Sequence, residues 1–111
     1  MEPAEQGKRP YEVERAARHA QRPGFHISEL TIGSTQEVPW HYHSQVHDTF
    51  YVLEGRIKVS FRDPVEEVVL GPGETTFARV RRPHRASNIG TGSATFLVLQ
   101  GFGTYDFIPA P

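Results

Sequence analysis

The sequence has no cysteine, and this absence excludes several kinds of chemistry. Disulfides, thiolate nucleophiles and cysteine-ligated zinc sites all require that side chain. The chain also lacks an apolar run long enough to cross a bilayer, and its first residues lack the apolar stretch of a secretory signal. A chain without cysteine fits a reducing compartment. We therefore expect a soluble, cytoplasmic protein with no membrane partner.

An excess of charge of either sign is missing as well. The 12 Lys and Arg residues nearly balance the 13 Asp and Glu residues, which gives a formal net charge of −1. Such a balance implies no general attraction to nucleic acid, so we expect no nucleic-acid partner. The length of 111 residues is typical of one domain.

Short segments with the periodicity of β-strands account for most of the chain. Residues 57–62 alternate between apolar and polar side chains, which predicts a strand with one buried face. Residues 94–100 are almost wholly apolar, which predicts a central strand or one buried on both faces. Glycine and proline interrupt the chain at short intervals. About eight or nine such segments, with no clear helix, indicate a β-sandwich or a small barrel.

The two ends of the chain differ from its middle. Residues 1–22 are polar and charged, and we expect an N-terminal arm there, either a short helix or an extended segment along a sheet edge. Because this arm has few apolar groups, it should be loosely packed or docked on a partner subunit. Residues 23–111 should form the barrel. Its aromatic and proline-rich tail, residues 101–111, should pack across the outside of the sheet.

Three histidines have the spacing of a metal site. His41 and His43 are two residues apart, so on a strand their imidazoles point to the same face, and His84 lies far downstream. Neutral imidazole is the commonest metal ligand among side chains. In a metal-free barrel the same histidines would serve acid–base chemistry or packing. His19 and His26 read as surface or hydrogen-bonding residues.

The sequence around these histidines resembles the two motifs of the cupin superfamily over residues 25–102. Residues 41–55 read His-x-His, four residues, Asp, six residues, Gly. Residues 73–88 read Gly, five residues, Arg-x-Arg, two residues, His, three residues, Asn. Both blocks occur in the order and the register of the family, which makes the resemblance much more specific than a His-x-His pair alone.

Four features depart from the family pattern. Thr35 takes the place of the leading glycine of the first block, and Asp48 that of the usual glutamate. Arg79 and Arg81 replace the proline and the glycine of the second block. His47 adds an imidazole directly before the carboxylate.

The resemblance implies an all-β, single-domain jelly-roll barrel, also called a double-stranded β-helix, of the cupin type. It also implies a homodimer and a metal inside the barrel, held by three histidines and one carboxylate. Carried over by position, the ligands would be His41, His43, Asp48 and His84. Such a set suits one divalent transition metal, which could be Fe, Mn, Ni, Co, Cu or Zn. It leaves metal positions for water or substrate.

The identity of the fourth ligand is open between two neighbours. On an unbroken strand, His47 and Asp48 point to opposite faces, so only one of them can face the metal. The register counted back from Gly55 favours Asp48, although an Asp there could also cap the turn. If His47 is not a ligand, it becomes a catalytic candidate that could move protons.

Other residues near the motifs are candidates for substrate binding. Arg79 and Arg81 could orient a carboxylate, because a guanidinium binds that group through two hydrogen bonds. The alternative is a solvated loop, or pairing with nearby acids. Phe50 and Val52, with Tyr51 beside them, are candidates for the apolar walls of a cofactor pocket.

These residues lead to a functional hypothesis with two alternatives. The main hypothesis is a metal-dependent enzyme that acts on a small organic substrate, with anionic compounds included. Dioxygenase, isomerase, cyclase and lyase chemistry all occur on this scaffold, and the fold does not choose among them. The alternatives are a non-catalytic cupin that binds or senses a small ligand, and a metal-independent, epimerase-like enzyme that uses a His–Asp pair.

Overall fold

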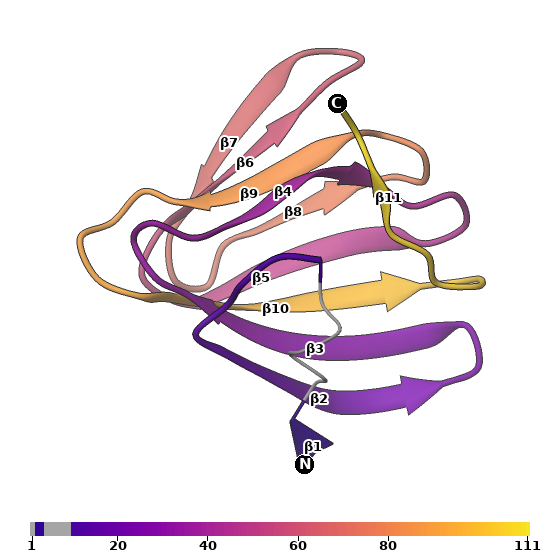
Figure 1. Ribbon diagram of the computed structural model, residues 1–111, viewed down its shortest axis with the longest axis horizontal. Coiled ribbons are helices and arrows are strands. Elements are labelled where there is room, and N and C mark those ends of the chain that lie inside the picture. The colour runs from indigo at the N-terminus through magenta and orange to yellow at the C-terminus, as the bar shows by residue number, and fades with distance from the viewer. Residues whose placement is uncertain (1, 4–9) are drawn as a thin grey trace.

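Two antiparallel sheets make up this computed structural model, which describes residues 2–3 and 10–111. The six-stranded sheet has, in spatial order, β1 (Glu2–Pro3), β2 (Arg15–Arg22), β3 (Phe25–Ile32), β10 (Ala94–Gly101), β5 (His47–Glu54) and β8 (Thr75–Ala78). The five-stranded sheet has, in spatial order, β11 (Ile108–Pro109), β4 (Glu37–Tyr42), β9 (His84–Asn88), β6 (Ile57–Phe61) and β7 (Glu66–Leu70). Figure 1 shows these two layers. Within the described residues every regular element is a strand, so the predicted all-β class is confirmed.

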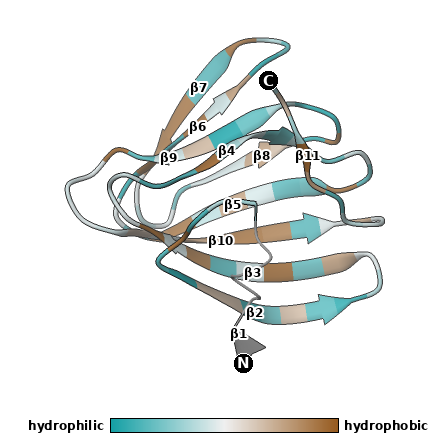
Figure 2. Cartoon of the chain, in the orientation of Figure 1, coloured by the Kyte–Doolittle hydropathy of each residue, from teal (hydrophilic) through white to brown (hydrophobic). Residues whose placement is uncertain are grey.

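The core lies between the sheets and is built by alternation along the strands. Bands of hydrophobic and hydrophilic residues follow one another along β3 in Figure 2. The strand predicted over residues 94–100 is central, because β10 pairs with β3 on one side and β5 on the other. Its inward apolar side chains, such as Phe96, are buried, and its outward side chains are half-buried.

Strand register brings the predicted site residues together. His41 on β4 is the direct partner of His84 on β9 in the five-stranded sheet. Asp48 lies near the start of β5 in the other sheet, where its partner on β10 is Gln100. One end of the space between the sheets therefore receives the histidines from one layer and the carboxylate from the other.

The segment before β3 is part of the sheet. Arg15–Arg22 is a strand rather than a helix, and it pairs with β3 near the edge of the sheet, with only the short β1 beyond it. Of the two predicted alternatives, the extended segment is therefore the one observed. The prediction of loose packing is wrong for Val13, Ala16 and Ala17, which are all buried. A few apolar side chains suffice for this because β3 supplies the hydrogen bonds of the strand. Residues 1 and 4–9 of the predicted arm lie outside the described residues. The domain boundary at residue 22 and the homodimer stay predictions.

The C-terminal tail does not stay on the outside of the sheet as predicted. β11 pairs with β4, so the tail extends the five-stranded sheet beside the strand that carries His41, as Figure 1 shows. Phe107, just before β11, packs against the hydrophobic core. An aromatic residue in a tail can therefore fill the end of a barrel as well as cover its surface.

None of the described residues forms a helix with the length and hydropathy needed to span a membrane. The cytoplasmic location and the absence of a nucleic-acid partner stay predictions.

Two phenylalanines provide a matched test of this core. Phe96 is 0% exposed, whereas Phe102 is 79% exposed and stacks on Phe25. Replacing Phe96 with alanine removes a buried ring and leaves a cavity, so we expect the free energy of unfolding to fall by about 3–5 kcal/mol. Phe102→Ala should lower it by less than about 1 kcal/mol. Denaturant unfolding followed by tryptophan fluorescence measures both changes. Equal losses in the two variants would contradict the proposed core.

Candidate metal centre

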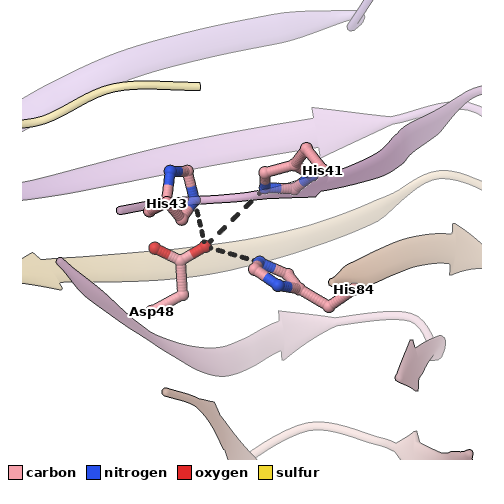
Figure 3. A group of neighbouring side chains, drawn as sticks. All are labelled: His41, His43, Asp48 and His84. Atoms are coloured by element: carbon pink, nitrogen blue, oxygen red, sulfur yellow. Dashed lines mark hydrogen bonds and ion pairs between the residues drawn. The ribbon is translucent and has the colours of Figure 1, made fainter. Parts of the chain in front are cut away.

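Four buried side chains form a cluster at the end of the barrel where β5 and β9 begin (Figure 3). His41 lies on β4 and His43 directly after it, so the two-residue spacing gives both rings the same direction. His84 starts β9 opposite His41, and Asp48 comes from β5. Each of the four is only 1–2% exposed.

The donor atoms of this cluster converge on one carboxylate oxygen. Asp48 Oδ2 lies 2.9 Å from Nε2 of His43 and 2.9 Å from Nε2 of His84. Nε2 of His41 lies 3.9 Å from the same oxygen. One donor atom from each of the four residues falls within 4.8 Å of the others, a group compact enough to surround a single ion.

Backbone carbonyls fix the direction of all three rings. Nδ1 of His41 donates to the Pro39 carbonyl at 2.7 Å, and Nδ1 of His84 donates to the Arg82 carbonyl at 2.8 Å. Nδ1 of His43 donates to the carbonyl of Asp106. A carbonyl oxygen only accepts hydrogen bonds, so each Nδ1 carries the proton. In a neutral ring the lone pair is then on Nε2, and all three lone pairs point at the same place.

This arrangement needs a cation at its centre. Three lone pairs and an ionised carboxylate are all acceptors, and in a buried space they repel one another unless a proton or a metal ion lies between them. Histidine rings that donate Nδ1–H to backbone carbonyls are also the usual form of histidine metal ligands. The donor set of this cluster therefore fits a divalent transition metal.

The pKa values within the cluster indicate where a proton is held. Burial alone would raise the pKa of Asp48, but its contacts with the three imidazoles outweigh burial and hold that pKa well below 3.8. Burial would lower the pKa of His43, yet the bond to Asp48 and its negative charge raise it above 6.5. Burial and the neighbouring imidazoles lower the pKa of His41. Without metal, His43 therefore takes a proton more readily than His41 does.

The tail supplies contacts to the cluster that sequence reasoning missed. The ring of Phe107 stacks on His41 at a centroid distance of 4.3 Å, and Tyr105 lies 5.4 Å from His43. The carboxylate of Asp106 accepts hydrogen bonds from the backbone N–H and the hydroxyl of Ser44, next to His43. These bonds lower the pKa of Asp106. They also hold the Asp106 carbonyl that orients His43.

The predicted catalytic residues lie elsewhere. His47 is on the opposite face of β5 from Asp48, where Nδ1 accepts a hydrogen bond from Val80 N at 3.1 Å. Arg79 and Arg81 are exposed, and the Arg79 guanidinium donates to the Asp63 carbonyl at 3.4 Å. The backbone N–H of Arg81, rather than its guanidinium, contacts the cluster region, because it donates to the His43 carbonyl at 2.7 Å. The structure therefore gives these residues contacts that hold the loop beside the cluster.

The three predicted pocket residues are divided between two faces of β5. Phe50 is buried, and its ring lies 5.9 Å from His84, so it is an apolar wall of the cluster. Val52 is fully buried one pleat further along, within the hydrophobic core. Tyr51 is 40% exposed on the outer face, because neighbouring residues of a strand point in opposite directions. The structure does not bring Tyr51 to the site.

Comparison with known proteins gives a family match and several similar structures. The family model described as a cupin domain matches residues 28–100. No curated protein matched the chain.

Three solved structures illustrate the likeness of fold. An oxalate decarboxylase from Lactobacillus farciminis has a TM-score of 0.79 at 16% sequence identity. The match covers 98% of this chain and 33% of the decarboxylase, so this chain spans about a third of that enzyme. A double-stranded β-helix protein from Klebsiella pneumoniae has a TM-score of 0.74 at 20% identity, over 99% of this chain and 85% of its own. A cupin-2 domain protein from Shewanella frigidimarina has a TM-score of 0.65 at 18% identity, over 81% of this chain and 82% of its own. The predicted jelly-roll barrel is confirmed.

Removing the Asp106 carboxylate tests how the tail is held. In Asp106→Ala, Ser44 loses both acceptors, so we expect the free energy of unfolding to fall by about 1–3 kcal/mol. Amide hydrogen exchange should also become faster at Ala110, whose N–H bonds the Trp40 carbonyl. Asp106→Asn keeps one acceptor oxygen and should lie between the wild type and the alanine variant. If Asp106→Ala leaves both stability and exchange unchanged, the tail is held by other contacts.

Proposed function

Because this chain belongs to the cupin family, we propose that it is a metal-dependent enzyme that acts on a small organic substrate. The observation that supports this most directly is the convergence of three Nε2 atoms and one carboxylate oxygen, with every Nδ1 bonded to a backbone carbonyl. A buried cluster of acceptors is costly without a cation, so the barrel end is suited to hold one.

The roles of the residues follow from their positions. We assign His41, His43, Asp48 and His84 as ligands of one divalent transition metal, whose identity the donor set leaves open. When bound, such a metal supplies Lewis acidity and, for a redox-active metal, electron transfer. Four protein ligands leave positions for a substrate on a metal that accepts six.

The surrounding residues shape the environment of the reaction. Phe50 and Phe96 pack beside the cluster and exclude water from its inner side, which strengthens every electrostatic interaction there. Tyr105 is 42% exposed and lies beside His43, so it marks the side of the cluster that is nearest to solvent. We propose that the substrate approaches past Tyr105.

The similar structures agree with a small organic substrate but identify neither the compound nor the reaction. The decarboxylase is named for oxalate, a small organic acid, and another similar structure is an oxalate oxidase. Their low sequence identity shows a shared fold alone, and this fold carries many reactions. The proposal therefore includes dioxygenase, isomerase, cyclase and lyase chemistry. The exposed positions of Arg79 and Arg81 do not favour an arginine clamp for an anion.

A non-catalytic ligand-binding or sensor cupin is the alternative, and one observation favours it. All four cluster residues are almost fully buried, and Phe107 stacks on His41. A substrate could therefore reach the metal only if the tail moved. Ligand-dependent thermal shifts without turnover of any compound in a panel of small organic acids, sugars and phenols would support this alternative over an enzyme.

Metal content tests the proposal. We expect the wild type, after separate loading with Fe(II), Mn(II), Co(II), Ni(II) and Zn(II), to retain about one ion per chain of at least one of them. His84→Ala should weaken that binding by more than about tenfold, since it removes one ligand. Elemental analysis and equilibrium titration measure both quantities.

His19→Ala is the matched control, because His19 is exposed and bonds Glu29 away from the cluster. It should retain the metal of the wild type. A wild type that retains none of the five ions would contradict the proposal. Turnover of a substrate that survives complete chelation would favour the metal-independent alternative instead.

The pH dependence of metal binding follows from the raised pKa of His43. Because a proton and a metal compete for the same Nε2, affinity should be greatest above the pKa of His43 and fall as the pH drops below it. The sign follows from the raised value: His43 still holds its proton at pH values where an ordinary histidine has lost it. Titrations with Co(II) between about pH 8 and pH 6 should show an affinity that falls as the pH drops, with a limiting slope of about tenfold per pH unit below the pKa of His43. Affinity that does not change over this range would contradict this assignment.

A further inference from the structure

A row of polar side chains crosses three neighbouring strands beside the cluster. Gln100 on β10 is the direct partner of His26 on β3 and of Asp48 on β5. All three occupy inward, core-facing positions on their strands. The inward neighbour two residues away is Ser28 for His26, Val98 for Gln100 and Phe50 for Asp48. Elsewhere on these strands the inward positions are mainly apolar, so a polar row here needs an explanation.

The contact between Gln100 and Asp48 fixes which carboxylate oxygen faces the histidines. Gln100 Nε2 donates to Asp48 Oδ1 at 2.9 Å, while Asp48 Oδ2 faces His43 and His84. The rotation of a carboxylate about its last bond is broad, so packing alone does not fix the plane of the group. A hydrogen bond to one oxygen, on the side away from the histidines, fixes that plane so that only the other oxygen faces them.

We propose that Gln100 is a positioning residue, which holds the Asp48 carboxylate so that a single oxygen, Oδ2, is presented to the metal. The functional part of this inference rests on the metal site proposed above. Held in this way, Asp48 occupies one metal position and leaves the other positions for a substrate. A carboxylate that turned freely could bind the metal through both oxygens, and the second oxygen would occupy one of the positions left for a substrate.

The next residue along the row supports this role. His26 is the direct partner of Gln100 on β3. Burial lowers the pKa of His26, and a hydrogen bond between the His26 and Gln100 side chains opposes that shift. A ring N–H that donates to the Gln100 amide must meet its oxygen end, which leaves the NH₂ end for Asp48. The ring of His26 also lies 5.2 Å from Tyr105, so the tail covers this end of the row. His26 therefore helps to set the direction of the amide.

Gln100→Leu removes the amide while keeping a side chain of similar size, and its first test needs no metal. Crystal structures of the metal-free proteins should show one Asp48 orientation in the wild type. In Gln100→Leu they should show a rotated carboxylate or two orientations. A single, unchanged orientation in the variant would overturn the proposal. If Gln100→Leu does not fold, Gln100→Asn serves in its place, because its shorter side chain withdraws the amide from Asp48.

The second test uses Co(II) as the probe, because its visible absorption reports the ligand geometry. Gln100→Leu should bind Co(II) about 10- to 100-fold more weakly than the wild type, with shifted absorption bands. Gln21→Leu is the matched control. Gln21 pairs with His26 from the other side of the row, and it is exposed, bonding Arg18 instead of the cluster. It should match the wild type in affinity and spectrum.

The outcomes separate this inference from the proposed function. If the wild type and Gln100→Leu bind Co(II) equally and with the same spectrum, Gln100 has no positioning role and the metal site stands. If the wild type binds no Co(II) or other ion, the proposed function fails, and the metal-free crystal structures still decide whether Gln100 orients Asp48.

Discussion

The site depends on one constraint, the convergence of four hydrogen-bond acceptors in a space from which water is excluded. Three imidazole nitrogens and one carboxylate oxygen point at a common centre, and each residue is only 1–2% exposed. In a low-dielectric interior such groups repel one another strongly unless a proton or a metal ion lies between them. The protein maintains this arrangement by bonding each Nδ1 to a backbone carbonyl, which prevents the rings from turning away.

The barrel makes this convergence possible because its two sheets supply different parts of it. Pairing of β4 with β9 places His41 opposite His84, and these rings would face solvent if the sheet stood alone. The six-stranded sheet covers them and brings Asp48 on β5 into contact. The packing of one sheet on the other therefore both buries the histidine rings and places the Asp48 carboxylate against them. It is this packing that lowers the pKa of Asp48 and raises that of His43.

The sequence predicted the parts of the site that follow from local periodicity. Two-residue spacing placed His41 and His43 on one face. The register counted back from Gly55 favoured Asp48 over His47, and the structure places His47 on the outer face of β5. Tyr51 shows the limit of this reasoning, because its position next to Phe50 suggested a pocket role although alternation turns it outward. The loop at Arg81 could not be predicted at all, since its backbone adopts a positive φ of 67° and its N–H, rather than its charge, makes the contact to His43.

The residues that the sequence did not reveal control how the cluster is oriented and reached. Gln100, Asp106 and Phe107 contact the cluster residues from distant parts of the chain, and no fixed spacing connects them to the histidines. Local motifs therefore determine which atoms can hold a metal. Long-range contacts determine which oxygen of Asp48 is presented and which side of the cluster a molecule can approach. Since these contacts lie outside the motifs, chains with the same histidine pattern can carry out different reactions. The features that distinguish this chain are therefore the tail and the polar row rather than the four cluster residues.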